Sequence, residues 1–138
     1  MQHHAAGRET RTPDARTVAM SIAYVRAITG VGLLLAPRVA GRPFVGQVVD
    51  TSFGEFACRA FGAADLSIAV GAILAERRGR PIRGWIEAGA MFDALDCAAA
   101  LFRGRGLPAF GRALYVSAGA VALVGTIAAQ NLDESNTD

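Results

Sequence analysis

Four apolar stretches, each about 20 residues long, constrain this chain more than any other feature of its sequence. They cover residues 17–36, 55–75, 85–102 and 109–130. A helix rises about 1.5 Å per residue, so each stretch is long enough to cross the hydrocarbon core of a bilayer. Strand-like alternation is nearly absent, and the stretches are apolar most of the way round a helix. The sequence therefore predicts an all-α fold with four transmembrane helices in an up-down bundle.

The segments outside these stretches are more polar and set the predicted domain organisation. Residues 1–16 are expected to form a flexible polar tail, residues 17–130 a four-helix membrane domain, and residues 131–138 an acidic polar tail. Residues 37–54 contain prolines and several glycines. They are predicted to form a long first loop that can include one amphipathic turn lying at the membrane interface.

Composition favours the membrane fold over two alternatives. Hydrophobic residues make up 52% of the chain and charged residues 19%. A soluble four-helix bundle would need a polar face on each helix, and residues 113–129 carry no charge. A core buried in an oligomer is weighed beside it as an alternative to membrane insertion. A cleaved signal peptide over 17–36 is disfavoured by Arg26 inside the apolar run and by the long polar segment before it. We therefore expect a multi-pass protein of the cell membrane, surrounded by the lipid bilayer.

The arginines predict sidedness and argue against a nucleic-acid partner. The net charge is only +2, and the arginines are scattered between apolar runs rather than gathered on one face. With four spans, the side that holds both termini and the 76–84 loop has seven arginines against five on the other. Both termini are therefore expected in the cytoplasm.

Six of the charged side chains within the apolar stretches are the candidate functional residues. They are Arg26, Arg59, Asp65, Glu87, Asp93 and Asp96. A charge at the middle of a bilayer costs about 2.5–3.5 kcal/mol on insertion scales, so these groups must pair inside the bundle or reach toward its ends. Arg59 and Glu87 lie near the starts of their stretches and can extend to water. The other four are deeper, and we expect one buried polar cluster linking the first three helices, with the fourth as an apolar wall.

Asp93 and Asp96 are the most suggestive pair within this set. Their i, i+3 spacing places both carboxylates on one face of a helix. Two carboxylates so close repel each other, so a cation is expected beside them: Arg26, Arg59 or a bound ion. Such a cluster either fixes helix packing without doing chemistry or forms a functional site. The sequence leaves both readings open.

Three classes of function can use this cluster. The favoured class is a non-catalytic accessory, scaffold or small-molecule-binding membrane subunit, with a membrane-protein partner or further copies of the chain docked on faces rich in small residues. The second is a membrane enzyme acting on a lipid-like substrate, in which Asp93 and Asp96 would hold Mg²⁺ against a diphosphate. A second acidic motif is absent, so catalytic residues remain unassigned. The third is an oligomeric carrier of protons or solutes, since four spans enclose little volume.

No resident cofactor or metal is expected. Cys58 and Cys97 lie in apolar stretches without ligand spacing and are expected to be small buried side chains. His3 and His4 lie in the polar tail without further ligands nearby.

Three motifs resemble those of small four-span bacterial membrane proteins. They are the Gly-Leu-Leu-Leu-Ala-Pro-Arg run at 32–38, Arg-Ala-Phe-Gly-Ala-Ala-Asp-Leu at 59–66, and Phe-Asp-Ala-Leu-Asp at 92–96. The likeness spans roughly residues 17–130 and implies an integral membrane protein without implying an activity. In the second motif such sequences often carry a basic residue beside the aspartate. This chain has Ala64 there, which puts a local Arg–Asp pair at Asp65 in doubt.

Overall fold

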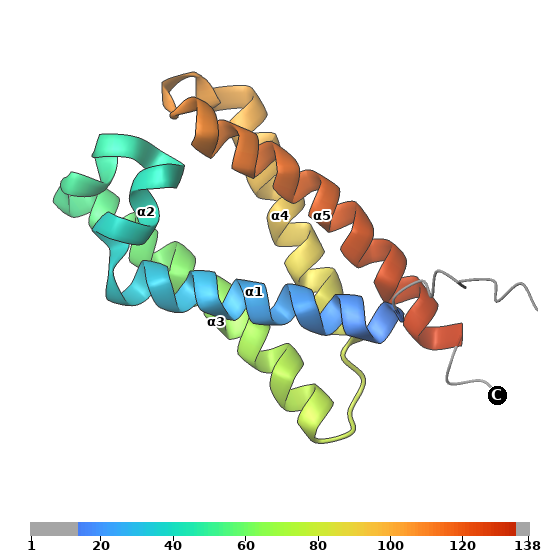
Figure 1. Cartoon of the computed structure of the whole chain (residues 1–138). Helices are drawn as coiled ribbons and strands as arrows, with labels where there is room; N and C mark the ends of the chain where they lie inside the picture. Colours follow the sequence, from blue (N-terminus) through green and yellow to red (C-terminus); the bar gives the residue numbers. More distant parts are fainter. Residues whose placement is uncertain (1–13, 135–138) are drawn as a thin grey trace, which may run out of the picture.

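The computed structural model describes residues 14–134, and every regular element within them is helical (Figure 1). The five α-helices are α1 (Ala15–Leu35), α2 (Pro37–Val45), α3 (Ser52–Arg77), α4 (Arg83–Arg103) and α5 (Ala109–Glu134). Two 3-10 segments, η1 (Gly46–Asp50) and η2 (Gly104–Gly106), join them. The predicted all-α class is confirmed.

The four long helices form two closely packed pairs. α1 packs mainly against α3, and α4 mainly against α5. The start of α1, the α3–α4 turn and the end of α5 lie toward one end of the molecule, whereas α2 and η2 lie toward the other (Figure 1). An ion pair of 2.9 Å between Arg16 Nε and Glu76 Oε1 joins the start of α1 to the end of α3. Successive long helices therefore alternate in direction.

Three helices of the described part, rather than the predicted four, are long and apolar enough to cross a membrane. They are Ala15–Leu35, Ser52–Arg77 and the Ala109–Ile127 part of α5. α4 has the same length as α1, 21 residues, but it carries Glu87, Asp93 and Asp96 along its course. The prediction of four such spans was wrong because three acids outweigh the alanines and leucines of α4.

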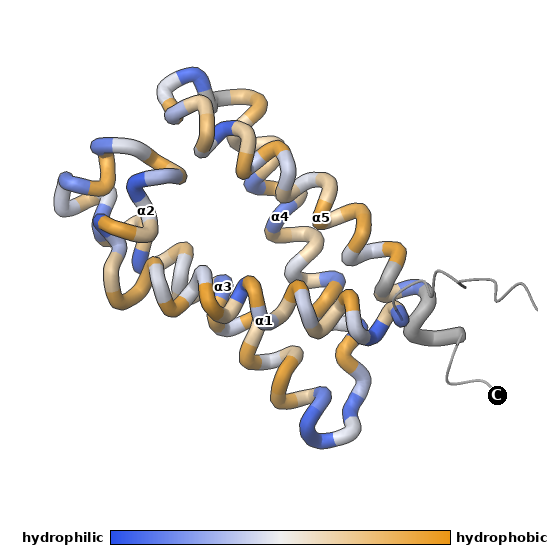
Figure 2. Tube along the Cα trace, viewed as in Figure 1, coloured by the Kyte–Doolittle hydropathy of each residue, from blue (hydrophilic) through white to orange (hydrophobic). Residues whose placement is uncertain are grey.

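Small side chains fill the interior, and large apolar side chains cover the outside. Ala19, Ala69 and Ala129 are fully buried, whereas Leu35 and Phe102 are 80% and 84% exposed. Figure 2 shows apolar residues along much of the length of the long helices. Water disfavours so much exposed apolar surface. Lipid does not, and helices in lipid associate through the close contact that small residues allow.

Charged residues bracket apolar lengths that match the thickness of a bilayer. In α3, Arg59 and Glu76 stand about 26 Å apart along the axis, with Asp65 as the only charge between them. α5 carries no charge over the roughly 31 Å from Arg112 to Asp133. The hydrocarbon core of a bilayer is about 30 Å thick. These helices therefore have the charge spacing of membrane spans.

The predicted long first loop over 37–54 is instead mostly helical. Pro37 occupies the first turn of α2, where its fixed φ favours a helix and its missing N–H costs nothing. Gly46 ends α2 with a φ of +65°, a conformation that glycine adopts without strain. The Thr51 side chain then accepts a hydrogen bond of 3.0 Å from the backbone N–H of Gly54 and caps α3. Local capping signals in this stretch outweigh its loop-like composition.

The two predicted tails lie mainly outside the described residues. Where they overlap with the structure, the helices are longer than expected: Ala15 and Arg16 belong to α1, and α5 continues to Glu134. α1 thus begins two residues before the predicted boundary at residue 17, and α5 ends four residues after the predicted boundary at residue 130.

α1 and α3 meet backbone to backbone at two glycines. A Cβ atom added to Gly30 would lie 2.8 Å from the carbonyl oxygen of Gly62 and 2.8 Å from the backbone nitrogen of Leu66. Neither backbone atom can move aside without moving α3. The distance between the two helices therefore depends on the absence of a side chain at Gly30.

We expect Gly30→Ala to lower the free energy of unfolding by about 1–3 kcal/mol, because α1 and α3 must separate to admit the methyl group. Gly84→Ala is the matched control, since a Cβ at Gly84 meets nothing within 4 Å. Thermal unfolding of the detergent-solubilised protein measures both. Equal stability of the two variants would contradict the close α1–α3 contact.

Candidate functional site

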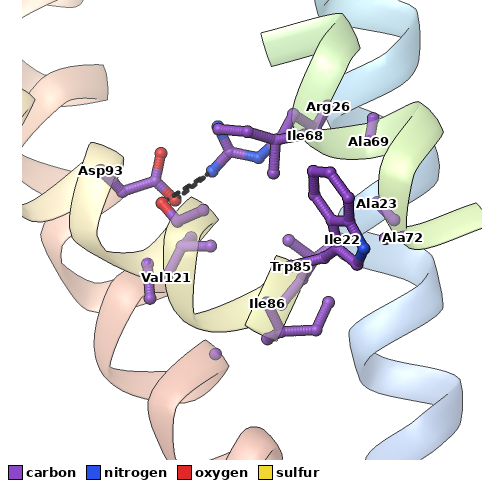
Figure 3. Close-up of a pocket in the computed structure, with 13 residues that line it drawn as sticks. Ile22, Ala23, Arg26, Ile68, Ala69, Ala72, Trp85, Ile86, Asp93 and Val121 are labelled. Atoms are coloured by element: carbon purple, nitrogen blue, oxygen red, sulfur yellow. Dashed lines mark hydrogen bonds and ion pairs between the residues drawn. The ribbon is translucent and has the colours of Figure 1, made fainter. Parts of the chain in front are cut away.

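Arg26 of α1 joins three helices through its guanidinium group. Its Nη1 donates a hydrogen bond to Oδ1 of Asp65 on α3. Its Nη2 donates to Oδ2 of Asp93 on α4 at 2.6 Å and to the carbonyl oxygen of Gly89 at 3.2 Å. Figure 3 shows the contact with Asp93. We call Arg26, Asp65 and Asp93 the Arg26 triad.

The triad lies at the middle of the helix lengths. In each of the three helices the triad residue follows a charged residue near the helix start by ten residues, about 15 Å along the axis. These pairs are Arg16 and Arg26, Glu55 and Asp65, and Arg83 and Asp93. A membrane bounded by the outer charges would place the triad near its midplane.

The triad is buried as well as central. Arg26 and Asp65 are 8% and 6% exposed, and the Asp93 side chain is 14% exposed. A guanidinium is planar and presents five donors, so it can hold two carboxylates and a carbonyl at once. Each partner comes from a fixed place on a helix, and removing one member would leave the others buried without compensation.

Small and aromatic residues shape the surroundings of Arg26. A Cβ atom on Gly89 would lie 3.4 Å from Arg26 Nε, so the glycine leaves the guanidinium room to reach the α4 backbone. On another side, the Phe92 ring centroid lies 5.9 Å from Arg26 Cζ, within the range of a cation–π contact. Phe92 also packs on Phe61 of α3, with ring centroids 5.0 Å apart. Apolar rings thus border the charged centre on the side of Phe92.

Three of the six candidate residues lie outside the triad: Arg59, Glu87 and Asp96. Arg59 is exposed; it pairs with Glu55 on its own helix and donates a 3.2 Å hydrogen bond to the Leu34 carbonyl. Glu87 is exposed and accepts a 2.6 Å hydrogen bond from Arg83. Both groups form local pairs nearer the helix ends.

Asp96 is half-buried and lies one helical turn beyond Asp93. Within the described part of the chain it forms no hydrogen bond or ion pair. The two aspartates share a face of α4 but differ in their partners: Asp93 pairs with Arg26, and Asp96 does not. The partner of Asp65 likewise comes from α1 and not from its own motif, in agreement with the doubt raised by Ala64.

A groove of about 390 Å³ lies between α1 and α5, with the triad at its base. Its apolar walls consist of Ile22, Val25, Leu114, Ala118 and Val121. Its polar lining consists of Ser21, Arg26, Thr29, Asp65, Asp93 and Ser117. We call it the α1–α5 groove.

The hydroxyl groups of this lining were missed by the sequence reasoning. Ser21 donates to the Thr17 carbonyl and Ser117 to the Leu114 carbonyl, each at 2.8 Å. Serine and threonine can bond back to their own helix in this way, so hydropathy passes over them. Ser21 and Thr29 are eight residues apart and lie on either side of Arg26 in the sequence. This helical spacing could have indicated that hydroxyl groups lie near Arg26.

Two further cavities border the site. One of about 20 Å³, room for roughly one water molecule, lies between Arg26, Asp93 and Trp85, the only tryptophan (Figure 3). Trp85 packs so closely on α3 that a Cβ atom at Gly71 would lie 2.4 Å from its ring. The other cavity, about 150 Å³, lies toward α2 and has an apolar lining that includes Phe61, Tyr115 and Cys58.

The described residues contain no group of three or more His, Cys, Asp or Glu side chains arranged to hold a metal ion. The thiol of Cys58 is buried and that of Cys97 half-buried, and both are free. No protein-family model, curated protein or solved structure matches this chain.

We expect Arg26→Met to lower the free energy of unfolding by about 3–5 kcal/mol, because it leaves two buried carboxylates without their cation. The matched change Arg59→Met removes an arginine from a half-exposed pair and should cost about 1 kcal/mol or less. Chemical or thermal unfolding in detergent micelles compares them. A similar loss of unfolding free energy in both variants would show that the triad stabilises the fold no more than the exposed Arg59 pair does.

Proposed function

We propose that this chain is an integral membrane protein that binds a small molecule in the α1–α5 groove. One observation carries the proposal: apolar walls from α1 and α5 stand above a base formed by the Arg26 triad. Ligand sites are typically apolar hollows with a few fixed polar groups that orient the ligand. The triad supplies such groups from three helices, so their positions do not depend on a loop.

We further propose that α4 crosses the membrane together with α5, although its composition does not qualify it alone. It packs along α5, and its deepest charge, Asp93, is paired with Arg26. Four crossings would place both termini on one side. The positive-inside rule assigns that side to the cytoplasm, since Arg77, Arg78 and Arg80 lie in the α3–α4 turn region.

The scaffold alternative has less support than ligand binding. Large apolar side chains face outward on all four long helices, for example Ile28, Phe56, Leu95 and Leu123. Such an even distribution suits contact with lipid and does not single out one docking face in the described part of the chain. A membrane-protein partner or a second copy therefore remains a secondary proposal.

The enzyme and carrier alternatives are also weaker. Asp93 is held by Arg26, and Asp96 does not line the groove, so the two carboxylates do not jointly offer a magnesium site. A carrier would need a path toward both sides of the membrane. The groove follows α1 only from Ser21 to Thr29, about 12 Å of its length, which favours binding over passage.

Reporter fusions test the topology. We expect a reporter placed before residue 1 and one placed after residue 138 to lie on the cytoplasmic side, because four crossings return the chain to its starting side. At both ends, a reporter that is active only in the cytoplasm should therefore be active, and one that is active only outside it should be inactive. Alkaline phosphatase and green fluorescent protein serve as a complementary reporter pair. Opposite sidedness of the two ends would mean that α4 does not cross.

A groove-filling substitution tests ligand binding. We expect Ala118→Phe to reduce co-purifying small molecules by about tenfold or more, because the ring occupies the groove. Ala120→Phe adds the same ring at an exposed position of α5 outside the groove lining and is the control. Native mass spectrometry of the protein released from detergent micelles measures the bound fraction. Equal occupancy in both variants, or none in the parent protein, would argue against the groove as a binding site.

A further inference from the structure

The Arg26 triad carries more negative than positive charge. Two carboxylates, Asp65 and Asp93, face one guanidinium, and all three groups are at least largely buried. The surroundings do not offer a second cation: the groove lining contains no other basic residue. In a medium of low dielectric constant an unbalanced carboxylate attracts a cation strongly. The base of the α1–α5 groove is therefore a place that favours positive charge.

Each carboxylate keeps one oxygen available. Asp65 uses Oδ1 and Asp93 uses Oδ2 to accept from Arg26. Their other oxygens, Oδ2 of Asp65 and Oδ1 of Asp93, accept no hydrogen bond within the described residues. Among the described residues, every fully buried side-chain oxygen or nitrogen has a hydrogen-bond partner. Because these two oxygens have none, they are not fully buried and are accessible. Because both residues line the groove, a donor placed in the groove can reach this pair of carboxylates.

The hydroxyl groups of the lining are also acceptors for an incoming ligand. Ser21 and Ser117 already donate their protons to helix carbonyls, which leaves oxygen lone pairs for a donor. Arg26, the only cation of the lining, is 8% exposed and engaged by three acceptors. An anionic ligand would meet acceptors and negative charge. A ligand that donates hydrogen bonds and carries positive charge would be stabilised by both.

We propose that the α1–α5 groove binds an amphipathic amine in its protonated form. The ammonium group donates to the accessible oxygens of Asp65 and Asp93, and the apolar body lies along Ile22, Val25 and Val121. This inference rests on the proposed ligand-binding function and adds the chemical class of the ligand to it.

A matched pair of probes separates the sign of charge from shape. 1-Adamantylammonium and adamantane-1-carboxylate share one apolar cage and differ in the charge of the attached group. The full chain is placed in nanodiscs of zwitterionic phosphatidylcholine and titrated with each probe. Trp85 is the sole tryptophan and borders the cavity beside Arg26 and Asp93, so its fluorescence reports on the site. We expect a saturable change with the ammonium probe and none with the carboxylate probe.

Three variants assign the binding to the groove. Asp93→Asn removes the excess charge and is expected to weaken binding of the ammonium probe by about tenfold or more. Ala118→Phe leaves the triad intact and should weaken binding equally by filling the groove, so it keeps the test decisive if Asp93→Asn does not fold. Ala120→Phe lies outside the lining and should bind like the parent protein.

The outcomes distinguish failure of this inference from failure of the proposed function. Saturable binding of the carboxylate probe that is blocked by Ala118→Phe would overturn the amine but keep the groove as a ligand site. An ammonium response that survives Ala118→Phe and Asp93→Asn would reflect partition into lipid and would overturn the inference. Absence of any saturable response to either probe, together with no co-purifying molecule, would overturn both.

Discussion

Burial of the Arg26 guanidinium between helices is the constraint on which the rest of this structure depends. Arginine keeps its charge under all ordinary conditions, so a cation at the middle of an apolar bundle can only be compensated by neighbouring acceptors. Asp65 and Asp93 provide them from α3 and α4. The relative position of α1, α3 and α4 is fixed at this depth, because moving any one of them would leave a charge without its partner.

The short reach of aspartate explains why so many small residues lie in the interior. A carboxylate one methylene from the backbone meets a guanidinium only if the helices approach closely. Gly30 and Gly62 allow that approach between α1 and α3, and Gly89 allows it at α4. In lipid, where no hydrophobic force drives helices together, such close contact also provides much of the packing attraction. The same small residues therefore serve both the charge contact and the association of the helices.

The excess carboxylate and the groove are two consequences of one arrangement. α1 and α4 belong to different closely packed pairs, and the triad joins the pairs through Arg26. Side chains of α1 and α5 do not fill the space above this junction, which leaves the α1–α5 groove over the charged base. α4 depends most on this arrangement. It is the one long helix of the described residues that is not apolar enough to qualify as a membrane span, and its deepest charge, Asp93, is compensated by Arg26. Its place in the bundle therefore depends on its ion pair with Arg26 and on its packing against α5.

The sequence by itself determined the helices, their approximate ends and the short set of charges that needed an explanation, because apolar length and helix-breaking residues act locally. It did not determine which charges meet. Asp93 and Asp96 share a face of α4, and only the crossing of α1 over α4 decides that Arg26 reaches Asp93. It also misjudged α4 as a fourth qualifying span and 37–54 as a loop, where three acids and local capping outweighed the average composition. The hydroxyl-lined groove arises only when α1 and α5 lie side by side over residues from α3 and α4, contacts between positions far apart in the chain that no local pattern encodes.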